Sequence, residues 1–85
     1  MKVSIIIPVY NVAQYIKRCL YSVSMQTYKH IECIIVDDCG TDNSMSIIED
    51  FITNLKRNIE FRIIRHLYNK GISESRNTGI HAATG

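Results

Sequence analysis

Two adjacent carboxylates, Asp37 and Asp38, follow directly after an apolar run at residues 34–36. A segment with the composition of a turn, residues 39–42, comes next. Carboxylates at the end of a buried strand cost free energy unless they bind a partner. We therefore expect this part of the chain to form a binding site.

Another apolar run, at residues 3–7, ends in a similar way with Pro8, Tyr10 and Asn11. In open parallel sheets, ligands bind outside the carboxyl ends of the strands, at the point where the strand order reverses. Because both runs have the character of such strands, we expect Pro8, Tyr10 and Asp38 to share one crevice.

A nucleotide is the ligand whose chemistry suits these residues. A carboxylate repels phosphate, so Asp38 should face a base N–H or the ribose hydroxyls. The ring of Tyr10 offers a surface for the base. The alternative for Asp37 or Asp38 taken singly is a cap on the turn before the next helix. The first turn contains no glycine, so the GxGxxG fingerprint is missing and NAD-type binding is not expected.

The chain has three apolar runs that alternate with three helical patterns, which predicts an α/β fold in the order βαβαβα. Residues 3–9 and 31–36 are almost continuously apolar, as expected for parallel strands covered by helices on both faces. Residues 59–66 carry charged residues among the apolar ones, which favours an edge strand. We expect three layers, a parallel sheet with helices on both faces. With right-handed crossovers, the simplest order of the strands in this sheet is 3-2-1.

Each helical pattern has its own start or packing signal. Asn11, with Gln14 three residues later, resembles a capping box for the first helix. Residues 42–44 can cap the second helix. The third runs from about residue 72 to 84, with Gly85 as its end, and one of its sides consists of small residues that let a helix lie close against a sheet. These small residues are Ser75, Gly79, Ala82 and Ala83.

The chain has 85 residues, enough for one small domain, whose core usually supplies about 3–5 kcal/mol of net stability. In the order 3-2-1 the first strand is an edge, although its sequence looks buried on both faces. We therefore expect residues 1–85 to be a single partial domain whose natural form continues into another strand. Unpaired apolar edges recruit other chains, so we also expect a homo-oligomer through this edge or the uncovered sheet face.

Composition and charge exclude several classes of protein. Ten Lys and Arg residues against eight Asp and Glu residues leave a net charge of only +2, and the basic residues are scattered, so no nucleic-acid partner is expected. No segment approaches the ~20 apolar residues of a membrane span, so any membrane association would come from elsewhere. The three cysteines lack CxxC and metal-finger spacing, which favours reduced thiols and a cytoplasmic protein.

We expect neither a metal site at the histidines nor a functional role for Cys19 and Cys33. His30, His66 and His81 lack the mutual spacing of metal ligands, so we expect them at the surface or in loops. Cys19 and Cys33 are expected to be buried apolar filler.

Five short motifs occur in order along the chain. They are residues 3–11 (VSIIIPVYN), 19–23 (CLYSV) with Gln26 and Thr27, 36–38 (VDD), 69–71 (NKG) and 76–80 (RNTGI). With these motifs the chain resembles the N-terminal part of family 2 glycosyltransferases with the GT-A fold. The resemblance covers essentially all 85 positions. It implies a Rossmann-like half-domain, the truncated nucleotide-binding part of that fold.

The resemblance also implies a ligand, a nucleotide-diphosphate sugar with uridine as the expected nucleoside. The substrate-binding residues that it implies are Pro8, Tyr10, Asn11, Asp37, Asp38 and Arg76. Pro8 and Tyr10 are then expected near the base, Asp38 hydrogen-bonded to it, and Asp37 close by. Arg76 can offset the charge of the diphosphate, with a solvated or salt-bridging arginine as the alternative.

For the whole protein, the resemblance implies inverting transfer of a sugar to a hydroxyl acceptor in cell-wall or polysaccharide synthesis, with Mg²⁺ or Mn²⁺ on the diphosphate. The family's Asp-x-Asp metal motif and general base would lie beyond Gly85. No catalytic residue, metal ligand or cofactor is therefore assigned to these 85 residues, which we expect to be inactive alone. Association of the whole protein with the inner face of the membrane is compatible with this role. Asn69 and Gly71 are expected to shape a loop.

The sequence departs from the family pattern in one turn, and two other classes of function are alternatives for the paired acids. The family commonly reads Asp-Asp-Gly-Ser-Thr-Asp, whereas residues 37–42 read Asp-Asp-Cys-Gly-Thr-Asp, so the turn glycine is displaced by one and Cys39 lies near the site as a passive thiol. A phosphoacceptor signalling module also has paired acids, but after its first strand. A non-catalytic nucleotide-binding or assembly module remains the alternative, and nucleotide affinity without sugar turnover would identify it.

Overall fold

The computed structural model describes residues 2–26, 30–55 and 59–84. Strands and helices alternate along the chain, as predicted. The elements are β1 (Lys2–Val9), α1 (Ala13–Ser24), β2 (His30–Asp37), α2 (Ser44–Asn54), β3 (Glu60–Arg65) and α3 (Ile72–Ala82). The three apolar runs therefore form the three strands. The ends of each strand lie within one residue of the ends that the sequence predicted.

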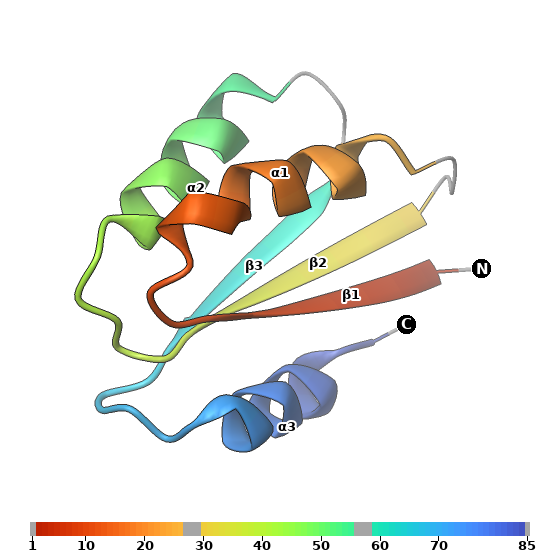
Figure 1. Ribbon diagram of the computed structural model, residues 1–85. Helices are drawn as coiled ribbons and strands as arrows, with labels where there is room; N and C mark the ends of the chain where they lie inside the picture. The colour runs from red at the N-terminus through yellow and green to blue at the C-terminus, as the bar shows by residue number, and fades with distance from the viewer. Residues whose placement is uncertain (1, 27–29, 56–58, 85) are drawn as a thin grey trace.

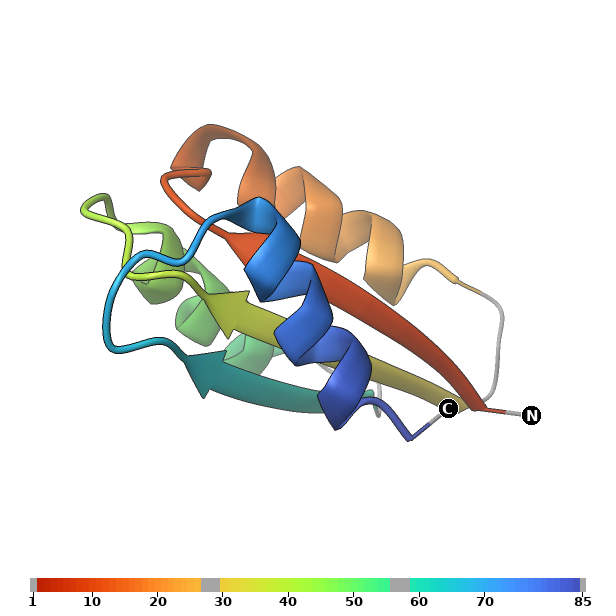
Figure 2. The same cartoon turned by 90° about the horizontal axis from the view of Figure 1, so that it is seen from below.

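The three strands form one parallel sheet with β2 in the centre and β1 and β3 at its edges. Helices α1 and α2 cover one face of the sheet, and α3 covers the other (Figure 1). Seen from below, α3 crosses β1 and β2 (Figure 2). The predicted three-layer arrangement and strand order 3-2-1 are confirmed.

The core lies mainly between the sheet and the α1–α2 layer. Ile16 and Leu20 are four residues apart on α1, which places them on one face of the helix, and both are buried. Ile48 of α2 and Ile35 of β2 are buried in the same cluster. All of residues 31–36 are buried, which confirms that β2 is covered on both faces. Cys33 is buried in this strand as expected, but Cys19 is exposed on α1, so the expectation of a buried filler was wrong there.

The predicted capping box of α1 is not formed. Asn11 has a left-handed backbone conformation with a φ of 52°, and its side-chain oxygen accepts hydrogen bonds from the amides of Thr41 and Asp42 instead. The N-cap residue is Val12, whose side chain cannot accept a hydrogen bond. The prediction failed because the cap comes from another loop: the carboxylate of Asp42 accepts the N–H of Ala13 at 3.0 Å.

Asp42 also binds the start of the second helix. Its Oδ1 accepts the N–H of Ser44 at 3.0 Å, while its Oδ2 holds Ala13. A hydrogen bond from the Ser44 hydroxyl, followed by the two amide contacts, lowers the pKa of Asp42 against the effect of burial. One carboxylate thus binds the N-termini of α1 and α2, where the helix dipole favours negative charge.

The small residues of α3 allow it to pack closely on the sheet, as predicted. Ser75 and Gly79 are buried, and Ala82 and Ala83 are half-buried. A Cβ atom at Gly79 would overlap the side chain of Ile6 in β1. The helix ends at Ala82 rather than at residue 84, and the expected stop at residue 85 lies outside the described residues.

A buried acid, Glu32, lies in the middle of the apolar strand β2 and was not anticipated. Its carboxylate accepts hydrogen bonds from the Ser4 hydroxyl at 2.7 Å, the Thr84 amide at 3.0 Å and the Arg62 guanidinium at 3.3 Å. The Thr84 amide foremost, with the Ser4 hydroxyl next, holds the pKa of Glu32 at about 2, against a usual 4.5. Glu32 therefore links all three strands to the segment after α3.

Candidate functional site

A cavity of about 330 Å³ lies where the carboxyl ends of β1 and β2 meet the start of α3. Pro8, Tyr10 and Asp38, which were predicted to share a crevice, all line it. The remaining lining includes the apolar side chains of Val12 and Ile72. Tyr10 is 49% exposed and is therefore accessible to a ligand. The cavity is thus a largely apolar slot with one carboxylate.

Asp38 is held by hydrogen bonds from the loop between β3 and α3. Its Oδ1 lies 2.8 Å from the Lys70 amide nitrogen and 2.8 Å from His66 Nδ1, and its Oδ2 accepts the Gly71 N–H at 2.9 Å. Burial by itself raises the pKa of Asp38, but these hydrogen bonds outweigh it, so the pKa lies below its ordinary value. Asp38 is therefore a buried, ionised carboxylate with a fixed orientation.

The acceptor capacity of Asp38 is not fully used by the chain. Each carboxylate oxygen can accept about two hydrogen bonds. Oδ1 has two partners, whereas Oδ2 has one among the residues that the structure describes. Asp38 lines the cavity, and Oδ2 is the oxygen of its carboxylate that has acceptor capacity left among the described residues.

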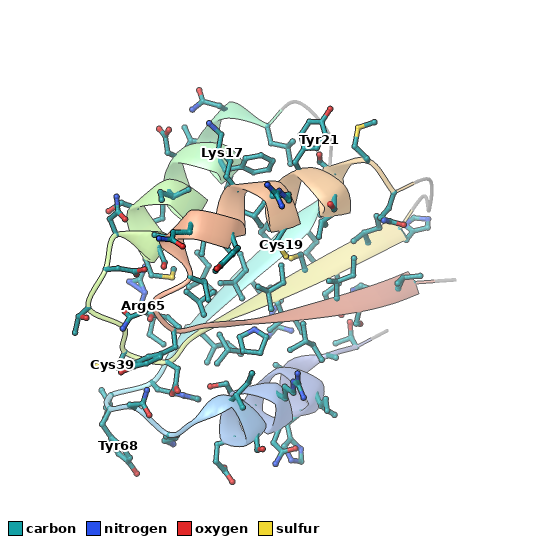
Figure 3. All side chains as sticks on the ribbon, viewed as in Figure 1. Lys17, Cys19, Tyr21, Cys39, Arg65 and Tyr68 are labelled. Carbon is teal, nitrogen blue, oxygen red and sulfur yellow. The ribbon has the colours of Figure 1, made fainter. Side chains whose placement is uncertain are left out.

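Asp37 has a different environment from its neighbour. Its side chain is half-buried, accepts the Cys39 N–H at 3.2 Å, and lies 4.0 Å from the Arg65 guanidinium. With Asn11 it lines a separate hollow of about 180 Å³. Cys39, Arg65 and Tyr68 gather at the end of the molecule where the strands end (Figure 3). The two predicted acids therefore face neighbouring hollows rather than one.

The turn between the two acids and α2 explains the displaced glycine. A Cβ atom at Gly40 would come within 2.8 Å of the Asn11 side-chain oxygen, so the close approach of the two loops requires glycine there. Cys39, at the position where the resembled family has glycine, adopts a φ of 61°. Because the glycine of this turn lies one position later than in the family, Cys39, which has a Cβ atom, occupies the left-handed region that favours glycine.

Arg76 lies outside both hollows. It is exposed on α3, next to Ser75, which lines the larger of the two. The structure therefore groups Pro8, Tyr10 and Asp38 around one cavity and Asn11 and Asp37 around the next, and it leaves Arg76 exposed on α3, in the lining of neither.

His66 and the loop after it were missed as parts of the site. His66 lies in the loop after β3, within the expectation of a surface or loop position, but its side chain is only 5% exposed and contacts Asp38. The sequence offered one signal for its role in the site: His66 directly follows β3, as Asp38 directly follows β2, so both lie at the carboxyl ends of neighbouring parallel strands. Gly71, expected to shape a loop, has a φ of 90° and directs its N–H to Asp38.

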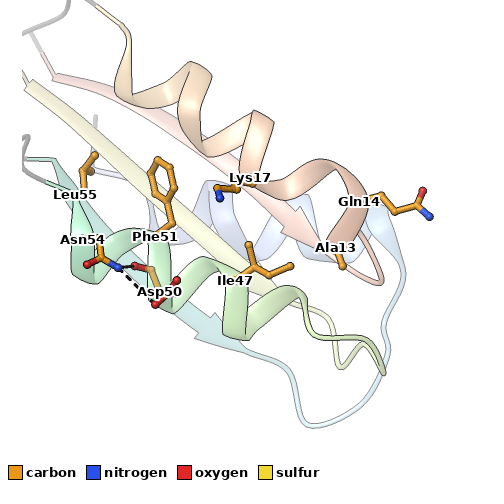
Figure 4. Close-up of a pocket in the computed structure, with 8 residues that line it drawn as sticks. All are labelled: Ala13, Gln14, Lys17, Ile47, Asp50, Phe51, Asn54 and Leu55. Carbon is orange, nitrogen blue, oxygen red and sulfur yellow. Dashed lines mark hydrogen bonds between the residues drawn. The ribbon is translucent and has the colours of Figure 1, made fainter.

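A larger groove of about 600 Å³ lies between α1 and α2, away from the predicted residues. Lys17 on α1 and Phe51 on α2 face it from opposite sides (Figure 4). Asp50 in this groove is exposed, and among the described residues its carboxylate accepts a hydrogen bond from the Asn54 side chain of the same helix. The smaller cavity with its fixed carboxylate is therefore the stronger candidate site.

Groups of metal-ligating side chains and helices long enough to cross a membrane are both absent from the described part of the chain. No group of three or more His, Cys, Asp or Glu side chains in residues 2–26, 30–55 and 59–84 is arranged to hold a metal ion. None of the helices within those ranges has the length and apolar character of a membrane span.

Comparison with known proteins gives consistent similarities. The sequence model described as "Glycosyl transferase family 2" matches residues 4–85. The uncharacterized glycosyltransferase EpsJ of Bacillus subtilis is 47% identical over 83 residues, which are 98% of this chain and 23% of EpsJ. Glycosyltransferase GlyA of Streptococcus pneumoniae is 40% identical over 85 residues, 99% of this chain and 12% of GlyA.

Solved structures share the fold. TarS residues 1–349 of S. aureus in complex with UDP-GlcNAc align with a TM-score of 0.86 and 31% identity over 100% of this chain and 24% of that one. The mannosyltransferase PcManGT of Pyrobaculum calidifontis in complex with GDP-Man and Mn²⁺ aligns with a TM-score of 0.90 and 26% identity over 99% and 25%. The chain thus spans about a quarter or less of the length of each of these proteins.

Proposed function

Because the chain belongs to glycosyltransferase family 2 and has the N-terminal part of the GT-A fold, we propose that it forms the nucleotide-binding part of a sugar transferase. The whole protein would transfer a sugar from a nucleotide-diphosphate sugar to a hydroxyl acceptor in the synthesis of a cell-wall or other polysaccharide. The observation that carries this proposal is the apolar cavity whose single fixed carboxylate has one acceptor position open.

In this proposal the base enters the 330 Å³ cavity. The ring of Tyr10 and the side chains of Pro8 and Ile72 contact its faces, and Oδ2 of Asp38 accepts one N–H. Uracil presents a single ring N–H between two carbonyl groups, which suits one open acceptor. Guanine presents two adjacent N–H donors, which a single position cannot satisfy. We therefore propose a uridine nucleotide as the donor's leaving group.

The other predicted residues are assigned to the rest of the nucleotide. Asn11 and Asp37 line the adjacent hollow and are placed near the sugar nucleotide beyond the base. Arg76 is exposed one residue after the cavity-lining Ser75, and we assign it to the diphosphate, whose charge a guanidinium can offset.

The chemical machinery of the transfer is proposed to lie in other parts of the whole protein. The described residues contain no three-ligand group that fits Mg²⁺ or Mn²⁺. We propose that residues 1–85 are a partial domain, that they are inactive alone, and that the general base for inverting transfer and the metal ligands come from the rest of the chain.

A cytoplasmic location is supported by the free thiols of Cys19, Cys33 and Cys39.

The edge position of β1 supports association with another strand. Its mostly apolar residues pair with β2 on one side only. We propose that a strand of the whole protein or of a second copy covers this edge, since such edges pair readily. Sedimentation equilibrium of the 85-residue chain tests the second case, and a monomer at high concentration would contradict it.

Titration of this chain with UDP in a calorimeter, with and without Mn²⁺, tests the proposed base site. We expect binding that is independent of Mn²⁺ and that weakens by about tenfold or more in Asp38→Ala, the effect of losing a hydrogen bond to a charged group. GDP should bind more weakly than UDP. The matched control is Asp50→Ala, which removes an exposed carboxylate on α2 and should leave the affinity unchanged.

Two results would contradict the proposed base site. If Asp38→Ala binds UDP as tightly as the unmodified chain, the base is not recognised by Asp38. If the unmodified chain binds neither nucleotide, these residues do not form a base site by themselves. Sugar transfer by the 85-residue chain would contradict the proposed inactivity, and nucleotide affinity without transfer by the whole protein would favour a binding module.

A further inference from the structure

His66 is fixed between Asp38 and α3. Its Nδ1 lies 2.8 Å from Asp38 Oδ1, and its Nε2 lies 2.9 Å from the hydroxyl oxygen of Thr78 on α3. Its backbone N–H donates to the Asp37 carbonyl at 2.9 Å. The side chains of His66 and Asp38 are only 5% and 3% exposed. The ring is therefore held at both nitrogens and at its backbone.

The direction of the hydrogen bond to Asp38 follows from the partners. An ionised carboxylate only accepts hydrogen bonds, so Nδ1 of His66 must carry the hydrogen that bridges the two side chains. The amide of Lys70 donates to the same oxygen, Oδ1. Together these two donors fill the acceptor positions of Oδ1 and leave the open position on Oδ2.

This arrangement determines where a ligand can bind Asp38. Without the Nδ1–H of His66, Oδ1 would regain a free acceptor position, and a buried carboxylate would lose one of the donors that compensate its burial. The Lys70 and Gly71 amides belong to an exposed loop, whereas the His66 ring is anchored to α3 through Thr78. The histidine thus ties the carboxylate to a rigid element of the fold.

We propose that His66 is the positioning residue of the nucleotide site. Its Nδ1–H occupies Oδ1 of Asp38 and thereby directs the open acceptor of Oδ2 at the base N–H of a uridine nucleotide. This inference rests on the proposed function of Asp38. It adds a role for a residue that does not itself line the cavity.

Two substitutions separate the contact with Asp38 from the contact with Thr78. In His66→Asn the side-chain amide nitrogen can take the place of Nδ1, whereas in His66→Gln the longer amide reaches the place of Nε2. We expect calorimetric titration with UDP to give a loss of about tenfold or more for His66→Gln, as for a hydrogen bond to a charged group, and a clearly smaller loss for His66→Asn. Thermal unfolding of both variants gives their folded fractions.

A double-mutant cycle distinguishes positioning from general support of the fold. If His66 acts through Asp38, His66→Gln should have almost no further effect on UDP affinity in an Asp38→Asn background. Losses that multiply would overturn the inference. A second measurement needs no ligand: the ring ¹⁵N resonances of His66 should show a protonated Nδ1, and an unprotonated Nδ1 would also overturn it.

The outcomes for the two proposals can be told apart. If the unmodified chain binds UDP and His66→Gln binds it equally well, the role of His66 is refuted while the nucleotide site stands. If the unmodified chain binds no UDP, the proposed base site fails and the inference fails with it. A selective loss in His66→Gln with rescue by Asn supports both.

Discussion

Single residues in the turn after β2 decide how the site is presented. Asp38 is turned inward to the loop before α3, while Asp37, one position earlier, remains half-buried beside Arg65. Neighbouring side chains along a strand point to opposite faces, which accounts for the different surroundings of Asp37 and Asp38 at the end of β2. Adjacent acids in a sequence can therefore take unrelated roles.

Cys39→Gly should stabilise the folded chain by about 0.5–1 kcal/mol, because glycine adopts the left-handed conformation without the ~1–2 kcal/mol penalty of a Cβ atom, offset in part by its greater freedom in the unfolded state. Equilibrium unfolding in urea measures the change. The matched substitution Gly40→Ala should destabilise the fold, since its Cβ would crowd Asn11. A lower free energy of unfolding for Cys39→Gly would show that the cysteine makes a compensating contact.

At the scale of elements, those with a local signal were predictable from the sequence. Continuous apolar runs indicated β1 and β2, and charged residues within residues 59–66 indicated the edge strand β3. Small residues indicated that α3 lies close to the sheet. Of the site, Pro8, Tyr10 and Asp38 were correctly grouped by the rule that ligands bind at strand ends.

Features that depend on distant partners were not predictable in the same way. The cap of α1 comes from Asp42, 29 residues after Ala13. His66 is buried because a carboxylate 28 residues earlier lies beside it. Glu32 is tolerated in a buried strand because Thr84, 52 residues later, donates to it. Local patterns carry no information on such pairs until the sheet register is known.

The packing of α3 makes a specific prediction for Gly79. Gly79→Ala should destabilise the fold by about 1–3 kcal/mol, because the added Cβ overlaps Ile6 and the helix must move away from β1. In a helix without such a contact, Ala is more stable than Gly by about 1 kcal/mol. Helix propensity and packing therefore act in opposite directions, and a loss of stability can be attributed to packing. Urea unfolding measures it, with Ser73→Ala on the exposed side of α3 as control. A stabilised Gly79→Ala variant would contradict close packing.

At the scale of the whole molecule, one buried acid joins the three strands to the segment that follows α3. Ser4, Glu32 and Arg62 come from the three strands in turn, and Thr84 follows the helix on the far face. Arg62 also donates to the Ala82 carbonyl at 2.7 Å, which closes the end of α3. This network holds the end of the sheet opposite the cavity that contains Asp38.

The low pKa of Glu32 predicts how stability depends on pH. Because the folded pKa of about 2 lies below the usual 4.5, the ionised carboxylate stabilises the fold at neutral pH, and this contribution is lost as the pH falls from about 4.5 towards 2. Urea midpoints of the unmodified chain and Glu32→Gln should therefore differ at neutral pH and converge in acid. Glu49→Gln, which removes an exposed ion pair with Arg65, should have little effect at any pH. A gap that does not change with pH would refute the assignment.

The shared carboxylate of Asp42 has a consequence for how the molecule opens. Since Asp42 accepts hydrogen bonds from the first residues of both α1 and α2, a movement that withdraws this side chain leaves the amides of Ala13 and Ser44 without their acceptor at the same time. The two helices should therefore exchange their N-terminal amide hydrogens as one cooperative unit, separately from α3 on the opposite face. The segment 38–43 between β2 and α2 thus connects the base contact proposed for Asp38 to the motion of an entire layer.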